Sequence, residues 1–166
     1  MMKLDDRTGT LALSPSGLQF LCMEAVPMLA CLAVWFVMGL DDFVPAAFRP
    51  LLMVVGVFLL LYLVMKFCYL KSMHYEISLQ QLMFEHGVFN VSRDYVELYR
   101  VVDYGECRNF LQVLFGLKTV SIYSGDRTSP RLDILGVEKD VDLQSFIRER
   151  VEINKQNRSI YEITNR

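Results

Sequence analysis

Two long apolar stretches occupy most of the N-terminal part of the chain. In the second, residues 51–70, Lys66 is the only charged side chain. At about 1.5 Å of rise per residue, a helix of this length covers roughly 30 Å, the thickness of a bilayer's hydrocarbon core. The stretch therefore predicts a membrane-spanning helix, with Lys66 as an anchor whose amine reaches the headgroups. A fully buried core helix is the alternative, but little else in the chain is large enough to surround it.

The first stretch, residues 18–40, predicts a second spanning helix. Glu24 and Pro27 interrupt it near its start, so its hydrophobic core is expected to begin at Ala25. A cleavable signal peptide is the competing interpretation, but the apolar run is too long and the residues before it are not clearly basic. Because the loop at 41–50 is short, the two helices are expected to form an antiparallel hairpin.

Basic residues near the ends of this hairpin predict its orientation. The outer flanks carry Lys3, Arg7, Lys66 and Lys71, and the loop carries Arg49. Since cytoplasmic flanks are enriched in Lys and Arg, both termini are expected in the cytoplasm and the loop, including Asp42, on the other side.

From His74 onward the pattern changes to short alternating segments separated by Gly, Asn and Asp, which is typical of β-strands. Strands are expected at residues 75–78, 82–86, 94–106, 118–124 and 131–135. A closing helix is expected at 141–154, where apolar residues recur at helical spacing and Asp140 or Asp142 is available as the N-cap. The chain is thus expected to divide into a cytoplasmic tail (1–17), a transmembrane hairpin (18–71), a β-rich domain (72–155) and a C-terminal tail (156–166).

Several strands closed by one amphipathic helix is the order of a pleckstrin-homology (PH)-like domain, in which the helix plugs one end of a bent sheet or barrel. Three motifs lie within this region: FLQVLF at 110–115 followed by Gly116, DRTSP at 126–130, and ILGV at 134–137. On these motifs, residues 75–155 resemble the bacterial PH domain family, of the YdbS-like membrane-anchored type. The resemblance implies an α+β fold with a two-helix hairpin before the domain, in the bacterial inner membrane. It implies no catalytic residues.

Composition and single residues give little sign of chemistry. The 17 Lys and Arg against 19 Asp and Glu give a net charge of −2, and neither half of the chain is basic, so no nucleic-acid partner is expected. The four cysteines suggest neither a disulfide framework nor a zinc site. His74 and His86 lack partners at ligand spacing. We therefore expect no metal, no cofactor, no catalytic residues and no enzymatic activity.

Two sets of residues are candidates for binding. Tyrosine beside arginine is typical of protein contact surfaces, and basic side chains can contact phosphorylated headgroups. The expected partner-binding residues are Tyr95, Tyr99, Arg100 and Tyr104, all in the strand expected at 94–106. The candidates for headgroup contact are Lys66, Lys71, Arg93 and Arg108.

The expected function is that of a non-enzymatic, membrane-anchored interaction or scaffold module at the cytoplasmic face. Its expected partners are membrane lipids and either further copies of itself or other proteins of a membrane complex. A sensor of lipid headgroups and an accessory subunit of a membrane enzyme or transporter are the alternatives, because a fold alone does not specify a partner.

Two structural expectations concern the apolar residues near the domain boundary. The segment at 110–115 is expected to pack one side into the domain core, through Leu111, Leu114 and Phe115. Because residues 71–74 can reach at most about 14 Å, the domain is expected to sit against the headgroups. The expected interfacial aromatics are Phe67, Tyr69 and Tyr75.

Overall fold

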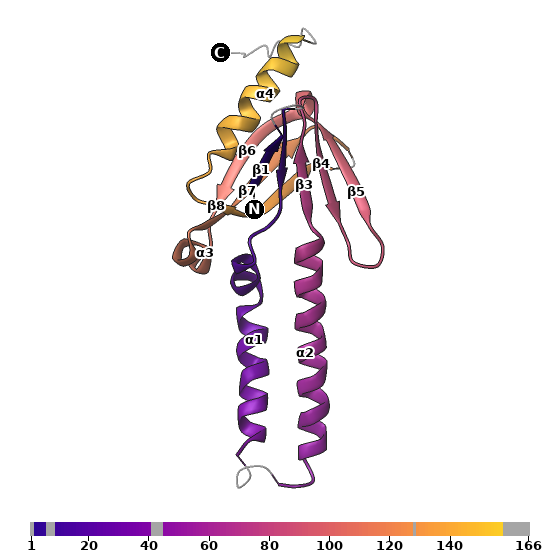
Figure 1. The fold of residues 1–166 in the computed structure, drawn as a ribbon, viewed down its shortest axis with the longest axis vertical. Coiled ribbons are helices and arrows are strands. Elements are labelled where there is room, and N and C mark those ends of the chain that lie inside the picture. Colours follow the sequence, from indigo (N-terminus) through magenta and orange to yellow (C-terminus); the bar gives the residue numbers. More distant parts are fainter. Residues whose placement is uncertain (1, 6–8, 41–44, 128, 158–166) are drawn as a thin grey trace.

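The computed structural model describes residues 2–5, 9–40, 45–127 and 129–157, and it shows an α+β fold. Figure 1 shows two antiparallel helices below a domain of strands and shorter helices. The elements are β1 (Met2–Asp5), β2 (Thr10–Leu13), α1 (Leu18–Met38), α2 (Arg49–Ser72), β3 (His74–Ile77), β4 (Gln81–His86), β5 (Ser92–Glu97), the 3₁₀ helix η1 (Leu98–Arg100), β6 (Val101–Cys107), α3 (Phe110–Phe115), β7 (Leu117–Ser124), β8 (Arg131–Glu138) and α4 (Leu143–Asn157).

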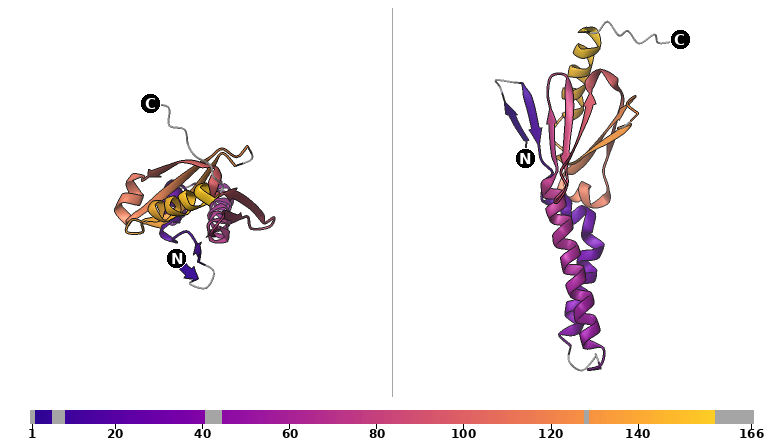
Figure 2. Two further views of the ribbon diagram at one scale, coloured as in Figure 1. Left: turned by 90° about the horizontal axis from the view of Figure 1, so that it is seen from above. Right: turned by 90° about the vertical axis from the view of Figure 1, so that its right-hand side faces the viewer.

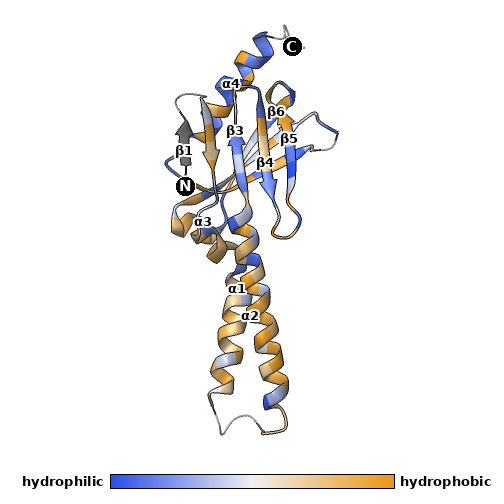
Figure 3. Ribbon diagram, turned by 45° about the vertical axis from the view of Figure 1, so that its right-hand side comes forward, coloured by the Kyte–Doolittle hydropathy of each residue, from blue (hydrophilic) through white to orange (hydrophobic). Residues whose placement is uncertain are grey.

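The helices α1 and α2 are long and apolar enough to cross a membrane. Their apolar side chains are mostly exposed in the isolated chain, and Figure 3 shows the hydrophobic colouring along both helices. Pro50 lies in the first turn of α2, where a missing N–H costs little. At its other end α2 passes into β3 through Met73 alone, so the short connection expected from the sequence is confirmed.

The first sheet begins before the hairpin. β2 pairs with β3, with Leu11 opposite Ile77 and Leu13 opposite Tyr75, and both leucines are buried. Thr10–Leu13 therefore lies in the domain sheet, although the sequence placed it in a tail. The helical hairpin is an insertion between two neighbouring strands, and Figure 2 shows β1 and β2 at one side of the domain.

The strands form two antiparallel sheets, one in the order β1-β2-β3-β4-β5 and the other in the order β6-β7-β8. Leu143, Ile147 and Val151 of α4 are buried in the core with side chains from both sheets, so α4 closes the domain as expected. Its N-terminus is capped by Asp142, whose Oδ1 accepts the Ser145 N–H at 3.1 Å. α4 continues into the expected C-terminal tail as far as Asn157, and residues 158–166 lie outside the described residues.

The strand expected at 94–106 is in fact two strands in different sheets. β5 pairs with β4, β6 pairs with β7, and η1 turns the chain between them. Leu98 and Val101 are both buried, because side chains three residues apart lie on one side of a 3₁₀ turn. The apolar pattern of the sequence therefore continues across η1 and gives no sign that the chain changes sheet there.

The helix α3 spans the residues expected from the sequence, but its side chains face differently. Leu114 is 69% exposed, Phe115 is also exposed and Leu111 is half-buried, so the expected packing of this side into the core is wrong. The buried side chain is Gln112, whose Nε2 donates to Gln19 Oε1 of α1 at 3.0 Å and to Thr119 Oγ1 at 2.9 Å. These polar partners decide which side of α3 faces the domain.

Tyr75 is likewise a core residue, although the sequence placed it at the membrane interface. It is almost fully buried, and its hydroxyl donates to the Asp133 carbonyl oxygen at 3.0 Å. Burial raises the pKa of the Tyr75 hydroxyl above its ordinary value. Phe67 and Tyr69, the other two expected interfacial aromatics, are exposed on α2.

The start of α1 packs directly on β8 at Gly136. Gly136 has φ +65°, and a Cβ there would lie 2.9 Å from Gln19 Cβ and 3.0 Å from Ser16 N. The Ser16 N–H also donates to the Gly136 carbonyl at 3.3 Å. Leu70, in the last turn of α2, and Met73, just after α2, belong to the domain core. Both ends of the hairpin are therefore packed into the domain.

Replacing Gly136 by alanine should loosen this junction. Gly136→Ala is expected to lower the free energy of unfolding by about 1–3 kcal/mol, because Cβ disfavours positive φ and overlaps the start of α1. Gly125→Ala is the matched control, since a Cβ at Gly125 has the Arg100 oxygen as its nearest neighbour, at 3.8 Å. Denaturation of both variants in detergent measures the difference, and equal effects would contradict this account of the junction.

Candidate functional site

The structure separates the four residues expected to bind a partner. Tyr95 lies in β5, Tyr99 and Arg100 form part of η1, and Tyr104 lies in β6, half-buried against the core. Two of them are in contact, since Arg100 Nε donates to the Tyr99 hydroxyl at 3.0 Å. The four residues therefore do not share one strand face.

Arg100 joins η1 to the turn between β7 and β8. Its guanidinium lies 3.6 Å from Asp126 Oδ1 and 3.7 Å from Glu97 Oε2, and its carbonyl accepts the Gly125 N–H at 2.9 Å. The hydrogen bond with Tyr99, followed by the charge of Asp126, raises the pKa of Arg100. This corner lies at the end of the domain away from the hairpin, as the course of β5 in Figure 1 shows.

An open groove of about 470 Å³ runs between β6 and α4. β6 is the edge strand of its sheet, and among the described residues it pairs only with β7. Val102, 68% exposed, and Tyr104 line the strand side of the groove. Arg148 and Glu152 line the helix side and form an ion pair at 3.1 Å. The groove thus combines the backbone edge of a strand, an apolar side chain and charges of both signs.

The candidates for headgroup contact lie in the hairpin or at the domain end next to it, and three of them have acidic partners. Lys71, in the last turn of α2, has its Nζ 5.8 Å from the Phe67 ring centroid. The three ion pairs are Arg93 with Glu85 at 2.6 Å, Arg108 with Glu106, and Lys66 with Glu24 at 3.9 Å. A phosphate would have to compete with these carboxylates.

Glu24 and Lys66 meet between the two helices, a contact that the sequence did not predict. Glu24 is buried and breaks the helical geometry of α1, with φ −113° and ψ 22°. The Tyr62 hydroxyl donates to its second oxygen at 3.2 Å. Opposite charges near the same end of two neighbouring apolar helices were the signal for this pair, because charges within such segments are usually paired.

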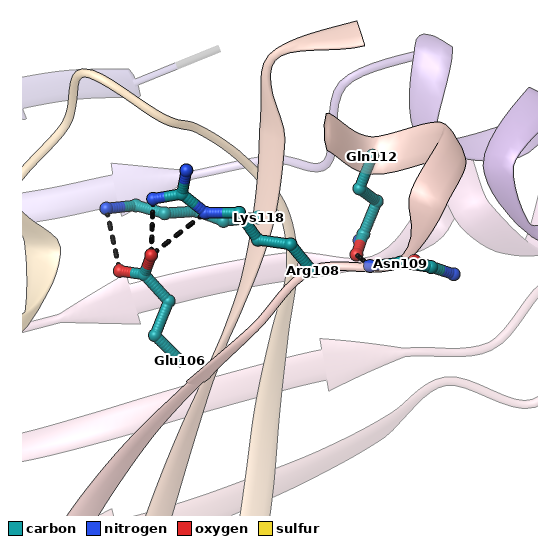
Figure 4. Close-up of polar contacts among 5 residues, drawn as sticks. All are labelled: Glu106, Arg108, Asn109, Gln112 and Lys118. Carbon is teal, nitrogen blue, oxygen red and sulfur yellow. Dashed lines mark hydrogen bonds and ion pairs between the residues drawn. The ribbon is translucent and has the colours of Figure 1, made fainter. Parts of the chain in front are cut away.

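Glu106 connects the end of β6 to the start of β7 (Figure 4). Its Oε2 accepts the Lys118 amine at 3.0 Å, and its Oε1 accepts Arg108 Nε at 3.0 Å. The hydrogen bond from Lys118, with that from Arg108, holds the pKa of Glu106 below its usual range. Next to these contacts of Glu106, Asn109 caps α3, and its N–H donates to Gln112 Oε1 at 3.0 Å. The Glu106–Lys118 contact thus joins β6 to β7, and the Asn109–Gln112 contact fixes the start of α3.

Within the described part of the chain, no group of three or more His, Cys, Asp or Glu residues is placed to hold a metal ion. All four cysteines are free thiols.

Comparison with known families matches the sequence profile of the bacterial PH domain to residues 25–151. The chain belongs to the bacterial PH domain family. The match includes most of the helical hairpin and all strands from β3 to β8, so the family expected from the motifs is confirmed. Neither the curated proteins nor the solved structures gave a match. Membership of a PH domain family suggests a non-enzymatic interaction module.

The Glu106 contacts give a prediction for stability and its pH dependence. Glu106→Gln should lower the free energy of unfolding by about 1–3 kcal/mol at neutral pH, because it leaves the buried Lys118 amine beside a neutral amide. The folded pKa of Glu106 is depressed below 4.5, so its contribution is complete above pH 4.5 and is lost as the pH falls through the folded pKa.

Denaturant unfolding in detergent over a range of pH measures this contribution. The difference between wild type and Glu106→Gln should shrink in acid. Glu76→Gln, on the exposed side of β3, is the control and should change stability by less than about 0.5 kcal/mol. A difference that persists unchanged in strong acid would contradict the assigned role of the Glu106 carboxylate.

Proposed function

We propose that this protein is a non-enzymatic interaction module of the bacterial inner membrane. Its hairpin spans the bilayer, and its PH domain is held at the cytoplasmic surface. The groove between β6 and α4 binds an extended segment of a protein partner, which is a second copy of the chain or another protein of a membrane complex. The groove along the edge of β6 is the observation that carries this proposal.

The chemistry of the groove suits an added strand. An edge strand presents backbone N–H and C=O groups, and an extended segment that pairs with them gains affinity from main-chain hydrogen bonds. Val102 offers an apolar contact for an alternate side chain of that segment, and the exposed Arg148–Glu152 ion pair gives the groove a polar rim. Tyr99 and Arg100 immediately precede β6, so they lie next to the end of the groove that Val101 lines.

The two helices support the membrane assignment. Each is long and apolar enough to span a bilayer, and each leaves most of its apolar surface uncovered by the rest of the chain. Water on that surface would be costly, because exposed apolar area costs about 25 cal/mol per Å². The excess of Lys and Arg on the outer flanks of the hairpin supports a cytoplasmic domain.

A sensor of lipid headgroups has less support than a protein-binding module. Arg93, Arg108 and Lys66 already pair with carboxylates, so a phosphate would gain little net charge there. If the partner is an enzyme or a transporter, the chain is its accessory subunit, and the same groove is the proposed contact.

The first test of this proposal concerns topology. In a cysteine-free background, Ala47→Cys should react with a membrane-impermeant maleimide in intact cells, because residue 47 is exposed at the turn of the hairpin. Asp42, which the sequence places on the same side of the membrane, lies outside the described residues. Cys107 restored alone is exposed on the domain and should react only after the membrane is opened. The reverse labelling pattern would overturn the cytoplasmic assignment.

The second test concerns the groove. Val102→Lys should abolish the crosslinked complex formed by the full-length chain in native membranes, because a lysine at this position fills the strand side of the groove with charge. Ile153→Lys is the matched control, since Ile153 is also exposed but lies on α4 away from the groove lining. The mass of the complex distinguishes a second copy from another protein. Equal complex formation by both variants would reject the groove as the binding site.

A further inference from the structure

Two apolar surface patches lie outside the groove. The α3 patch consists of the exposed side chains of Phe110, Val113 and Leu114, and the loop patch consists of those of Val88, Phe89 and Val91 between β4 and β5. Phe110 is 82% exposed and Phe89 is 87% exposed. A single exposed apolar residue is ordinary, but two clusters, each with an almost fully exposed phenyl ring, mark contact surfaces.

Both patches lie at the end of the domain that carries the hairpin. In Figure 1, α3 lies beside the first turns of α1, and the loop between β4 and β5 points the same way on the other side, beside α2. Gln112 of α3 is hydrogen-bonded to Gln19 of α1 at 3.0 Å. The ring of His86, at the end of β4, lies 6.4 Å from that of Tyr69 in α2. The patches therefore flank the hairpin where it joins the domain.

On the surface of a soluble domain, a helix turns its apolar side inward and its polar side outward, and α3 does the reverse. Its polar residue Gln112 faces inward with its hydrogen bonds satisfied, and Phe110, Val113 and Leu114 face outward. A helix with an apolar outer side is typical of segments that lie in the membrane interface, where the apolar side is buried in the boundary between headgroups and acyl chains. The fold therefore leaves the apolar side of α3 uncovered by the rest of the described chain.

The loop patch, like α3, exposes apolar side chains where polar ones are usual. Gly87, with φ +115°, and Asn90 are residues that a tight turn uses. Val88, Phe89 and Val91 occupy the remaining positions, where polar residues usually predominate. Apolar side chains at the tip of a hairpin directed along the helices are suited to the surface that the helices enter.

Basic side chains border both patches. Arg108 lies just before α3, Arg93 follows the loop patch, and Lys71 is in the last turn of α2. Lys and Arg at the end of a spanning segment are typical of the cytoplasmic interface, where anionic lipids attract them. In this arrangement they can lie at headgroup level without forming a site for one particular phosphate.

We propose that the α3 patch and the loop patch insert into the lipid interface on opposite sides of the hairpin, so that the domain meets the bilayer at three places. A lipid surface is the occupant because the hairpin stands between the patches: one flat phase covers all three, whereas a protein would have to wrap around the helices. This inference rests on the proposed function, because it requires the hairpin to span the bilayer.

The test uses the full-length chain in nanodiscs of phosphatidylethanolamine and phosphatidylglycerol with brominated acyl chains. Bimane is attached to Phe89→Cys or Val113→Cys in a cysteine-free background, and both labels should lose emission relative to unbrominated discs. Val57→Cys, exposed on α2, is the positive reference. Leu79→Cys, exposed in the turn between β3 and β4 at the far end of the domain, should keep its emission. Since all four side chains are exposed, labelling should not disturb the core.

The outcomes separate this inference from the proposed function. Quenching at Val57→Cys without quenching at Phe89→Cys and Val113→Cys would overturn the inference and leave the spanning hairpin in place. Absence of quenching at Val57→Cys would instead overturn the spanning hairpin itself. Protection of both patch labels from aqueous iodide in native membranes, but not in lipid-only discs, would show that a protein covers the patches and would also overturn the inference.

Discussion

The hairpin leaves and re-enters the domain through two strands that are hydrogen-bonded to each other, and the rest of the structure depends on this connection. β2 leads to α1 through residues 14–17, and α2 passes into β3 with Met73 between them. Because Leu13 is paired with Tyr75, the two connections start from neighbouring strands, which lie about 4.8 Å apart in a sheet. Neither connection is long enough to act as a flexible linker, so hairpin and domain form one packed unit.

Buried polar groups give the junction its specificity. Gln112 satisfies its side-chain amide through Gln19 of α1 and Thr119 of β7, and Gly136 leaves room for α1 only because it lacks a Cβ. If α1 shifted relative to α3, a buried amide would lose its partners, at a cost of about 1–3 kcal/mol. Apolar contacts alone would tolerate such a shift more easily. The direction in which the hairpin leaves the domain is therefore coupled to the orientation of α3.

The sequence predicts the helices and strands of this fold better than it predicts how they pair and which of their sides are buried. Length and hydropathy locate α1 and α2, alternation locates most strands, and the FLQVLF segment followed by Gly116 locates α3. β2 escapes this approach because its pairing partner β3 follows only after the whole hairpin, so nothing near Thr10–Leu13 in sequence indicates a sheet. The buried side of α3 escapes it because Gln112 finds its partner Gln19 93 positions away in sequence. The groove is missed for the same reason, since β6 and α4 meet only through the tertiary fold, whereas the Tyr-Arg pair before β6 was visible as a local motif.

A domain fixed on its hairpin presents its groove at a fixed height. β6 has seven residues and spans roughly 23 Å at about 3.3 Å per residue. The groove follows the first four of these residues, the part farther from α3 and the hairpin. With the hairpin in the bilayer as proposed, a segment that pairs with β6 must therefore reach about 10 Å or more above the surface.

A second copy of this chain carries its domain at that height, in the same plane and with the same orientation, so much of the rotational entropy of association is lost before contact. The rigid junction thus favours partners anchored in the same membrane over soluble ones.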